Sequence, residues 1–264
     1  MKRIALIATA AAMLLATAAV AFAATTPVNT YKSTYKFNPS KAGSAKKPQK
    51  VSFKQNIQVT PGTSGDRAGV LKKIVTTIYG LKVDGKNFPT CTTAQIQAKH
   101  KDTFCPKGAL VASGSIKALL GPATNPAASA TEGSCDPLLH VWNAGQGKLA
   151  FFFVDKAPNN LCLGGAITTG KVGPWKATYK QSGKNVVITV PIPTTVDYPL
   201  QGTVGSLQSE ILNWKGQSSK GHTSIASVAC KGSKRPYSTA FTANPISGGA
   251  SQTVTVKGSA ACKK

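Results

Sequence analysis

The chain of 264 residues has 32 lysine or arginine residues and 8 aspartate or glutamate residues, which gives a net charge of +24 at pH 7. A field of this size predicts attraction to polyanions such as anionic wall polymers, membrane surfaces or nucleic acid. The few carboxylates leave little material for catalysis, which needs several titratable groups in convergent positions.

The first 23 residues have the three parts of a secretory signal peptide. Lys2 and Arg3 make the start positive, residues 4–20 are apolar or small apart from two threonines, and residues 21–23 (Ala-Phe-Ala) form a small-x-small cleavage site. The alternative is an uncleaved anchor, but a run of ~17 residues is shorter than the ~20 that span a bilayer. The sequence predicts export, a mature chain that starts at Ala24 without a membrane span, and an extracellular or cell-envelope location.

Residues 24–264 are expected to form a single all-β domain, with residues 24–50 as a basic, partly extended segment. Short runs of Val, Ile, Thr, Phe and Tyr are separated by Gly, Pro, Asn and Ser, which is typical of sandwiches and barrels. We expect an antiparallel, jelly-roll-like β-sandwich of about twelve strands. The runs are 31–37, 51–59, 73–83, 109–119, 138–142, 149–154, 175–181, 185–192, 206–214, 222–230, 237–243 and 252–256.

Three local patterns refine this expectation. Residues 150–154 are apolar on both faces, which predicts a central buried strand. Residues 182–184 (Ser-Gly-Lys) predict a three-residue hairpin turn with glycine at a positive φ. Residues 94–99 predict a short helix capped by Thr92 or Thr93, and residues 207–212 fit a strand or a helix.

The six cysteines all follow the predicted cleavage site. An even number in an exported chain indicates disulfides, and no Cys-x-x-Cys pair supports a metal site. We expect sequential pairing, in which the first loop of ~15 residues contributes ~3 kcal/mol and the last bond ties down the carboxy terminus. The expected pairs are Cys91–Cys105, Cys135–Cys162 and Cys230–Cys262.

Most of the positive charge is lysine, and it is spread unevenly along the chain, with no acidic residue between residues 24 and 65. The candidate polyanion contacts in this segment are Lys32, Lys36, Lys41, Lys46, Lys47, Lys50 and Lys54. Lysine is a hydrated point charge without the planar fork with which arginine reads bases, so sequence-specific nucleic-acid binding is not expected. The candidate partners are anionic cell-wall polymers or glycans, and the alternative is that the charge serves solubility alone.

The aromatic residues suggest a second kind of binding. Trp142, Trp175 and Trp214, together with the tyrosines, are candidates for a sugar-stacking platform of a carbohydrate-binding module. The alternative is that these rings pack in the core, where large aromatic side chains are usually found.

Chemistry-bearing residues are scarce. His100, His140 and His222 are available for a triad or a metal, but the sequence has no Gly-x-Ser-x-Gly elbow, no spaced metal ligands and no phosphate-binding glycine loop. We therefore predict a non-enzymatic protein with no catalytic, cofactor-binding or metal residues. A secreted hydrolase of unfamiliar type is the alternative, and a pocket that joins a histidine to a carboxylate would favour it.

Two segments around the first cysteine pair are distinctive. They are 87–96 (Asn-Phe-Pro-Thr-Cys-Thr-Thr-Ala-Gln-Ile) and 105–114 (Cys-Pro-Lys-Gly-Ala-Leu-Val-Ala-Ser-Gly). With residues 40–48 and the closing pattern of Cys230, Phe241 and Cys262, they resemble uncharacterised secreted actinobacterial proteins. The resemblance covers most of the mature chain and implies an exported, cysteine-containing β-sandwich with a short helix between the first two cysteines. It implies no catalytic residues, and Ala112 replaces the first glycine of a Gly-Ser-Gly-like element.

Overall fold

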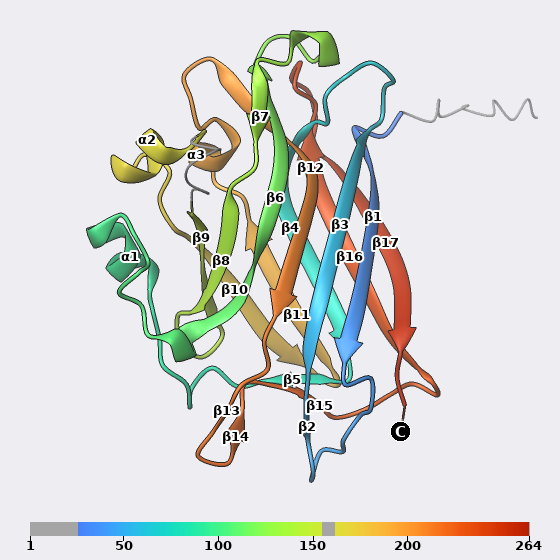
Figure 1. The fold of residues 1–264 in the computed structure, drawn as a ribbon. Coiled ribbons are helices and arrows are strands. Elements are labelled where there is room, and N and C mark those ends of the chain that lie inside the picture. Colours follow the sequence, from blue (N-terminus) through green and yellow to red (C-terminus); the bar gives the residue numbers. More distant parts are fainter. Residues whose placement is uncertain (1–25, 155–161, 264) are drawn as a thin grey trace, which may run out of the picture.

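The structure is a computed structural model that describes residues 26–154 and 162–263 (Figure 1). The predicted signal peptide lies outside the described residues. Within the described part of the chain, no helix is long and apolar enough to cross a membrane.

A twelve-stranded antiparallel sheet dominates the molecule. Eleven of its strands follow one another in the order β1 (Asn29–Asn38), β3 (Ser52–Pro61), β12 (Thr203–Trp214), β6 (Leu110–Pro122), β8 (Leu138–Asn143), β9 (Lys148–Val154), β10 (Trp175–Ser182), β11 (Asn185–Pro191), β4 (Val70–Tyr79), β16 (Lys234–Asn244) and β17 (Gln252–Ala261). The twelfth, β7 (Gly133–Cys135), pairs with β6 beside β8.

The two ends of this strand order lie side by side (Figure 1). At one end of the seam, the backbone N–H of Val28 donates to Oε1 of Gln252 over 2.8 Å. At the other end, Lys41 forms a parallel bridge with Lys263. The sheet therefore curls into a nearly closed barrel or sandwich, and the expected all-β antiparallel class is confirmed.

Smaller elements close the ends of this sheet. Two short sheets are formed by β2 (Gln49–Lys50), β15 (Ile225–Ser227) and β5 (Leu81–Val83), and by β13 (Ser218–Ser219) and β14 (His222–Thr223). The helices are α1 (Thr93–Lys99), α2 (Gly164–Thr168) and α3 (Thr194–Asp197), with 3₁₀ turns at Lys107–Ala109 and Ala128–Ala130. In Figure 1 the three α-helices lie on the side of β8 and β9, away from the seam of β1 and β17.

Alternation of side chains along the strands separates the core from solvent. In β1, Tyr35 and Phe37 are buried in the interior whereas Lys36 between them is exposed. Strand β9 is buried on both faces, as predicted for residues 150–154. The segment that carries α1 packs on the neighbouring strand β8, where Cys91 donates its backbone N–H to the carbonyl of Asn143.

The predicted helix and hairpin are confirmed. Thr92 caps α1 in a capping box: its Oγ1 accepts the backbone N–H of Gln95, and its own backbone N–H donates to Oε1 of Gln95. The hairpin forms where it was predicted, but Ser182 pairs with Asn185, so the turn has two residues, Gly183 and Lys184, rather than the expected three. Gly183 has the expected positive φ, 57°.

The run 222–230 is not one strand, so this prediction is wrong in detail. It breaks at Ser224, which bonds to Gln217 through both its backbone N–H and its Oγ, and β14 and β15 form separate short ladders. Residues 207–212 belong to strand β12 rather than to a helix.

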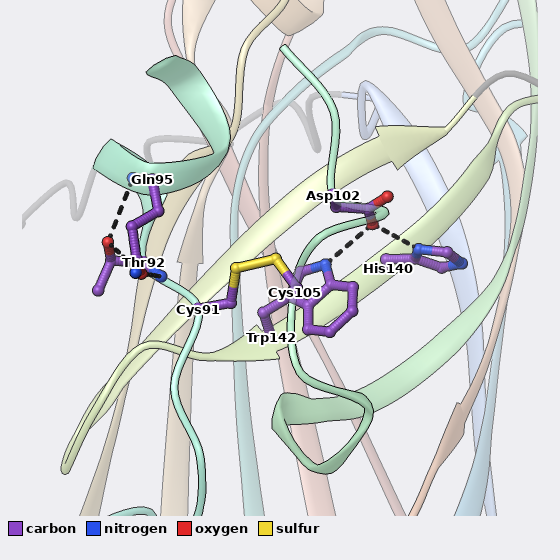
Figure 2. Close-up of a disulfide and its surroundings, with 7 residues drawn as sticks. All are labelled: Cys91, Thr92, Gln95, Asp102, Cys105, His140 and Trp142. Atoms are coloured by element: carbon purple, nitrogen blue, oxygen red, sulfur yellow. Dashed lines mark hydrogen bonds and ion pairs between the residues drawn. A yellow bond between two sulfur atoms is a disulfide. The ribbon is translucent and has the colours of Figure 1, made fainter. Parts of the chain in front are cut away.

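The three disulfides pair as the sequence predicts, Cys91 with Cys105, Cys135 with Cys162 and Cys230 with Cys262. The first bond joins the chain before α1 to the chain after it, as Figure 2 shows. The third bond fixes the end of β17, next to the loop that follows β1.

Candidate functional site

The seven lysines expected to contact polyanions are all exposed, and they fall into two groups. Lys32, Lys36 and Lys54 lie on the outer side of β1 and β3. The other four, Lys41, Lys46, Lys47 and Lys50, lie between the end of β1 and the start of β3.

The strand register places the first group on one continuous surface of β1, β3, β12 and β6. Three rows of residues cross these four strands in the order from β1 to β6. The rows are Lys36, Lys54, Asn213 and Ser113; Thr34, Asn56, Ile211 and Ser115; and Lys32, Gln58, Ser209 and Lys117. We call these twelve residues the lysine–amide face, and four of them are lysines while none is acidic.

The face points to solvent because the alternate positions of the same strands fill the core. Phe53, Ile57 and Leu212, for example, are almost completely buried. Lys36 and Lys54 are directly opposite each other, and like charges at such a position destabilise a strand pair. Two ammonium groups ~6 Å apart in water repel each other by about 0.7 kcal/mol, which a bound anion would offset.

The amide groups of the face are available for ligands. Within the described residues, the side chains of Asn56, Gln58 and Asn213 make no hydrogen bond or ion pair with the protein. Each primary amide offers two donors and one acceptor. The face therefore combines fixed positive charge with free donors that suit sulfate, phosphate, carboxylate or hydroxyl oxygens.

The expected tryptophan platform is wrong. The exposed fractions of Trp142, Trp175 and Trp214 are 5%, 7% and 5%, so no face of these rings is open to a sugar. Trp214 stacks on Phe53 with ring centroids 5.4 Å apart, and Trp175 packs against Phe151 and Phe153. Trp175 and Trp214 are buried because their positions on the strands point into the core, whereas Trp142 is covered by the loop that carries Asp102.

Trp142 lies on the opposite side of the sheet and belongs to a cluster that the sequence did not indicate (Figure 2). Oδ2 of Asp102 accepts the indole N–H of Trp142 over 3.0 Å and lies 2.6 Å from Nδ1 of His140. Asp102 is buried, whereas the side chain of His140 is 25% exposed. Asp102 follows α1 in the loop closed by the first disulfide, so this cluster fastens the loop to β8.

The Asp102–His140 pair bears on the hydrolase alternative. His140 is opposite Ser113 of the lysine–amide face in the register of β6 and β8. Within the described residues, however, no hydroxyl or thiol is hydrogen-bonded to this imidazole, so the pair holds a histidine without an attached nucleophile. Sequence reasoning missed the pair because 38 residues separate its members.

The other two histidines lie apart from this pair. Nδ1 of His100 lies 2.7 Å from the carbonyl oxygen of Thr168, and Nδ1 of His222 lies 3.5 Å from Oδ2 of Asp84. Burial raises the pKa of Asp84, but hydrogen bonds from Asn87 and Lys86 and the nearby His222 outweigh it, so the pKa is below its usual range. Among the described residues, no group of three His, Cys, Asp or Glu side chains is placed to hold a metal ion.

Neither a known protein-family model nor a curated protein matches this sequence. The function therefore has to follow from the residues and their arrangement.

Proposed function

We propose that the protein is exported and non-enzymatic, and that it binds polyanionic polymers of the cell surface by charge through the lysine–amide face. The observation that carries this proposal is the in-register surface of lysines and unpaired amides, without an acidic residue, on four adjacent strands. Export is supported by the signal-like residues 1–23 and by three disulfides, which form and persist in oxidising compartments.

The spacing of the lysines suits an extended polymer. Lys32 and Lys36 are four residues apart on β1, or about 13 Å, and Lys32 and Lys117 are three strands apart, or about 14 Å. Such separations let several anionic groups of one chain be contacted together. Because lysine lacks the bidentate fork of arginine, these contacts recognise charge density rather than a base sequence.

The four lysines between β1 and β3 extend the positive surface. The segment between β1 and β3 starts two residues after Lys36 and carries Lys41, Lys46 and Lys47 in a loop and Lys50 in β2. In Figure 1 it lies below β1 and β3, next to the carboxy-terminal end of the chain. A polymer that crosses the face can therefore continue over this segment.

The proposal is tested by binding of the mature protein to dextran sulfate and to neutral dextran, over a range of salt concentrations. The face variant replaces Lys32, Lys36, Lys54 and Lys117 by Gln. The matched control replaces four exposed lysines of β9, β10 and β17, namely Lys148, Lys176, Lys180 and Lys257, and has the same net charge.

We expect the face variant to lose at least tenfold in affinity for dextran sulfate, the control to lose far less, and neutral dextran not to bind. Binding of the wild type should weaken as salt rises, because exposed charges are screened. An equal loss in both variants would show that the charge binds polyanions without a defined face, and no binding by the wild type would support solubility alone. Binding that ignores salt would reject the electrostatic basis of the proposal.

A further inference from the structure

The interior of the barrel contains a cavity that the proposed function does not use. Its volume is ≈ 110 Å³, and side chains from both layers of the sheet line it. Most of these are aliphatic or aromatic, for instance Ile116, Leu139, Phe153 and Ile188. Protein cores are normally packed without voids of this size, because each lost contact costs dispersion energy.

Two carboxyl groups, those of Glu210 and Asp197, line the cavity, and that of Asp197 is paired with Lys72. Glu210 of β12 is 6% exposed and lines the cavity. Its Oε1 accepts a hydrogen bond from Nε2 of Gln55 over 2.7 Å, and Oε1 of Gln55 in turn accepts the indole N–H of Trp214 over 3.2 Å. Within the described residues, Oε2 of Glu210 has no partner.

A second polar group of the cavity wall is also unpaired. The indole of Trp175 lines the cavity, and its Nε1–H is buried without an acceptor among the described residues. Buried polar groups in native proteins nearly always have a partner, so the indole N–H of Trp175 calls for an explanation, and the free oxygen of Glu210 lies in the wall of the same cavity. A ligand that supplies an oxygen atom would explain them.

The carboxyl group of Glu210 can donate a hydrogen bond when it is protonated and accept one when it is ionised. Burial raises the pKa of Glu210 to about 7, although the hydrogen bond from Gln55 lowers it. The other titratable groups nearby are Tyr35, which lies on β1, and Asp197, whose Oδ2 is 2.6 Å from Nζ of Lys72 at the α3 end of the cavity. No cation is paired with Glu210 among the described residues.

We propose that this cavity is a binding site for a small, uncharged, mainly apolar molecule of the size of a single aromatic ring, with one hydroxyl or carbonyl oxygen held by Glu210. The apolar lining takes the body of the ligand, as a dry cavity of ~150 Å³ takes benzene. The carboxyl group distinguishes ligands that carry an oxygen from pure hydrocarbons of the same size. The site lies inside the barrel and is independent of the lysine–amide face.

Phenol and toluene test the proposal, because they have equal numbers of heavy atoms and differ in the hydroxyl group. Binding to the mature protein is followed by NMR shifts of the methyl groups of Leu139 and Leu212. We expect both compounds to shift these methyl signals. In Glu210→Met, the ratio of the phenol affinity to the toluene affinity should fall at least tenfold.

The control is Ala118→Phe, which places a ring inside the cavity and should abolish the shifts with both compounds. If its thermal unfolding shows that this variant does not fold, Ile188→Phe replaces it. The proposal is overturned if neither compound shifts the methyl signals of the wild type at millimolar concentration. An unchanged affinity ratio in Glu210→Met, or unaltered binding in the filled variant, overturns it as well.

Discussion

Replacement of Glu210 by Gln should make the protein more stable at alkaline pH and leave it unchanged at acidic pH. Burial raises the pKa of this carboxyl from 4.5 to about 7 in the folded protein, in spite of the hydrogen bond from Gln55. A shift of this size corresponds to about 3 kcal/mol. The glutamine side chain keeps an oxygen that accepts from Gln55, but it never carries the charge whose burial is costly.

Proton linkage gives the sign of the stability change with pH. Because the folded state holds the proton more tightly than the unfolded state, the contribution of Glu210 to stability is fully present below pH 4.5 and is lost as the pH rises through about 7. The free energy of unfolding of Glu210→Gln should therefore equal that of the wild type near pH 4.5 and exceed it by about 3 kcal/mol at pH 8. Burial also raises the pKa of Asp197, to about 6, so the stability of both proteins should fall further as the pH rises through this value.

The assay is urea denaturation at a series of pH values from 4.5 to 8.5 with the disulfides intact, followed by tryptophan fluorescence. Trp214 reports directly on this region, because its indole donates to Gln55. The matched control is Glu132→Gln, which removes an exposed carboxylate and should leave the pH dependence of the wild type unaltered. Parallel stability curves for the wild type and Glu210→Gln between pH 5 and 8 would refute the reasoning.

Three further predictions concern the scaffold and the face. The double variant Cys230→Ala/Cys262→Ala should lose about 4 kcal/mol of unfolding free energy, measured in urea, because the unfolded chain gains the entropy of a loop with a sequence separation of 32. An unchanged free energy of unfolding would contradict this entropic effect. Asn143→Ala removes side-chain hydrogen bonds to the loop before the first disulfide, so calorimetry should show a loss of about 2–3 kcal/mol, whereas a loss below 1 kcal/mol would mean that solvent replaces them. Lys36→Thr relieves the repulsion with Lys54 and should raise stability by a few tenths of a kcal/mol at low salt, a gain that must vanish at 1 M salt if it is electrostatic.

The sequence determined the features that depend on neighbours along the chain. Alternation in residues 31–37 predicted a half-buried strand, and Thr92 predicted the start of α1. Glycine at position 183 predicted a turn that needs a positive φ. The sequential disulfides were also predicted, since each closes a short or moderate loop. These signals are local, so the amino-acid order alone contains them.

Strand β12 forms where the sequence predicts a strand, but its irregularity could not be predicted locally. The register with β6 shifts between Leu207 and Ser209, so that Leu207 and Glu210 both line the cavity although they are three residues apart. This spacing is also that of a helix face, so a helix over residues 207–212 remained an alternative to the predicted strand 206–214, which the structure confirms. The irregularity places the carboxyl of Glu210 in the core, where an alternating strand that started at Leu207 would have turned it to solvent.

The tertiary structure alone decided which residues meet. Side-chain alternation shows which residues share a face of a strand. The pairing of β12 with β3 and β6, however, joins segments that are far apart in the sequence, and only this register assembles the lysine–amide face. Likewise, the three tryptophans became core residues and Asp102 became the partner of His140 and Trp142 because distant segments pack together. The sequence by itself determined an all-β scaffold with sequential disulfides and a large positive charge, whereas long-range packing decided how that charge is displayed and what the interior encloses.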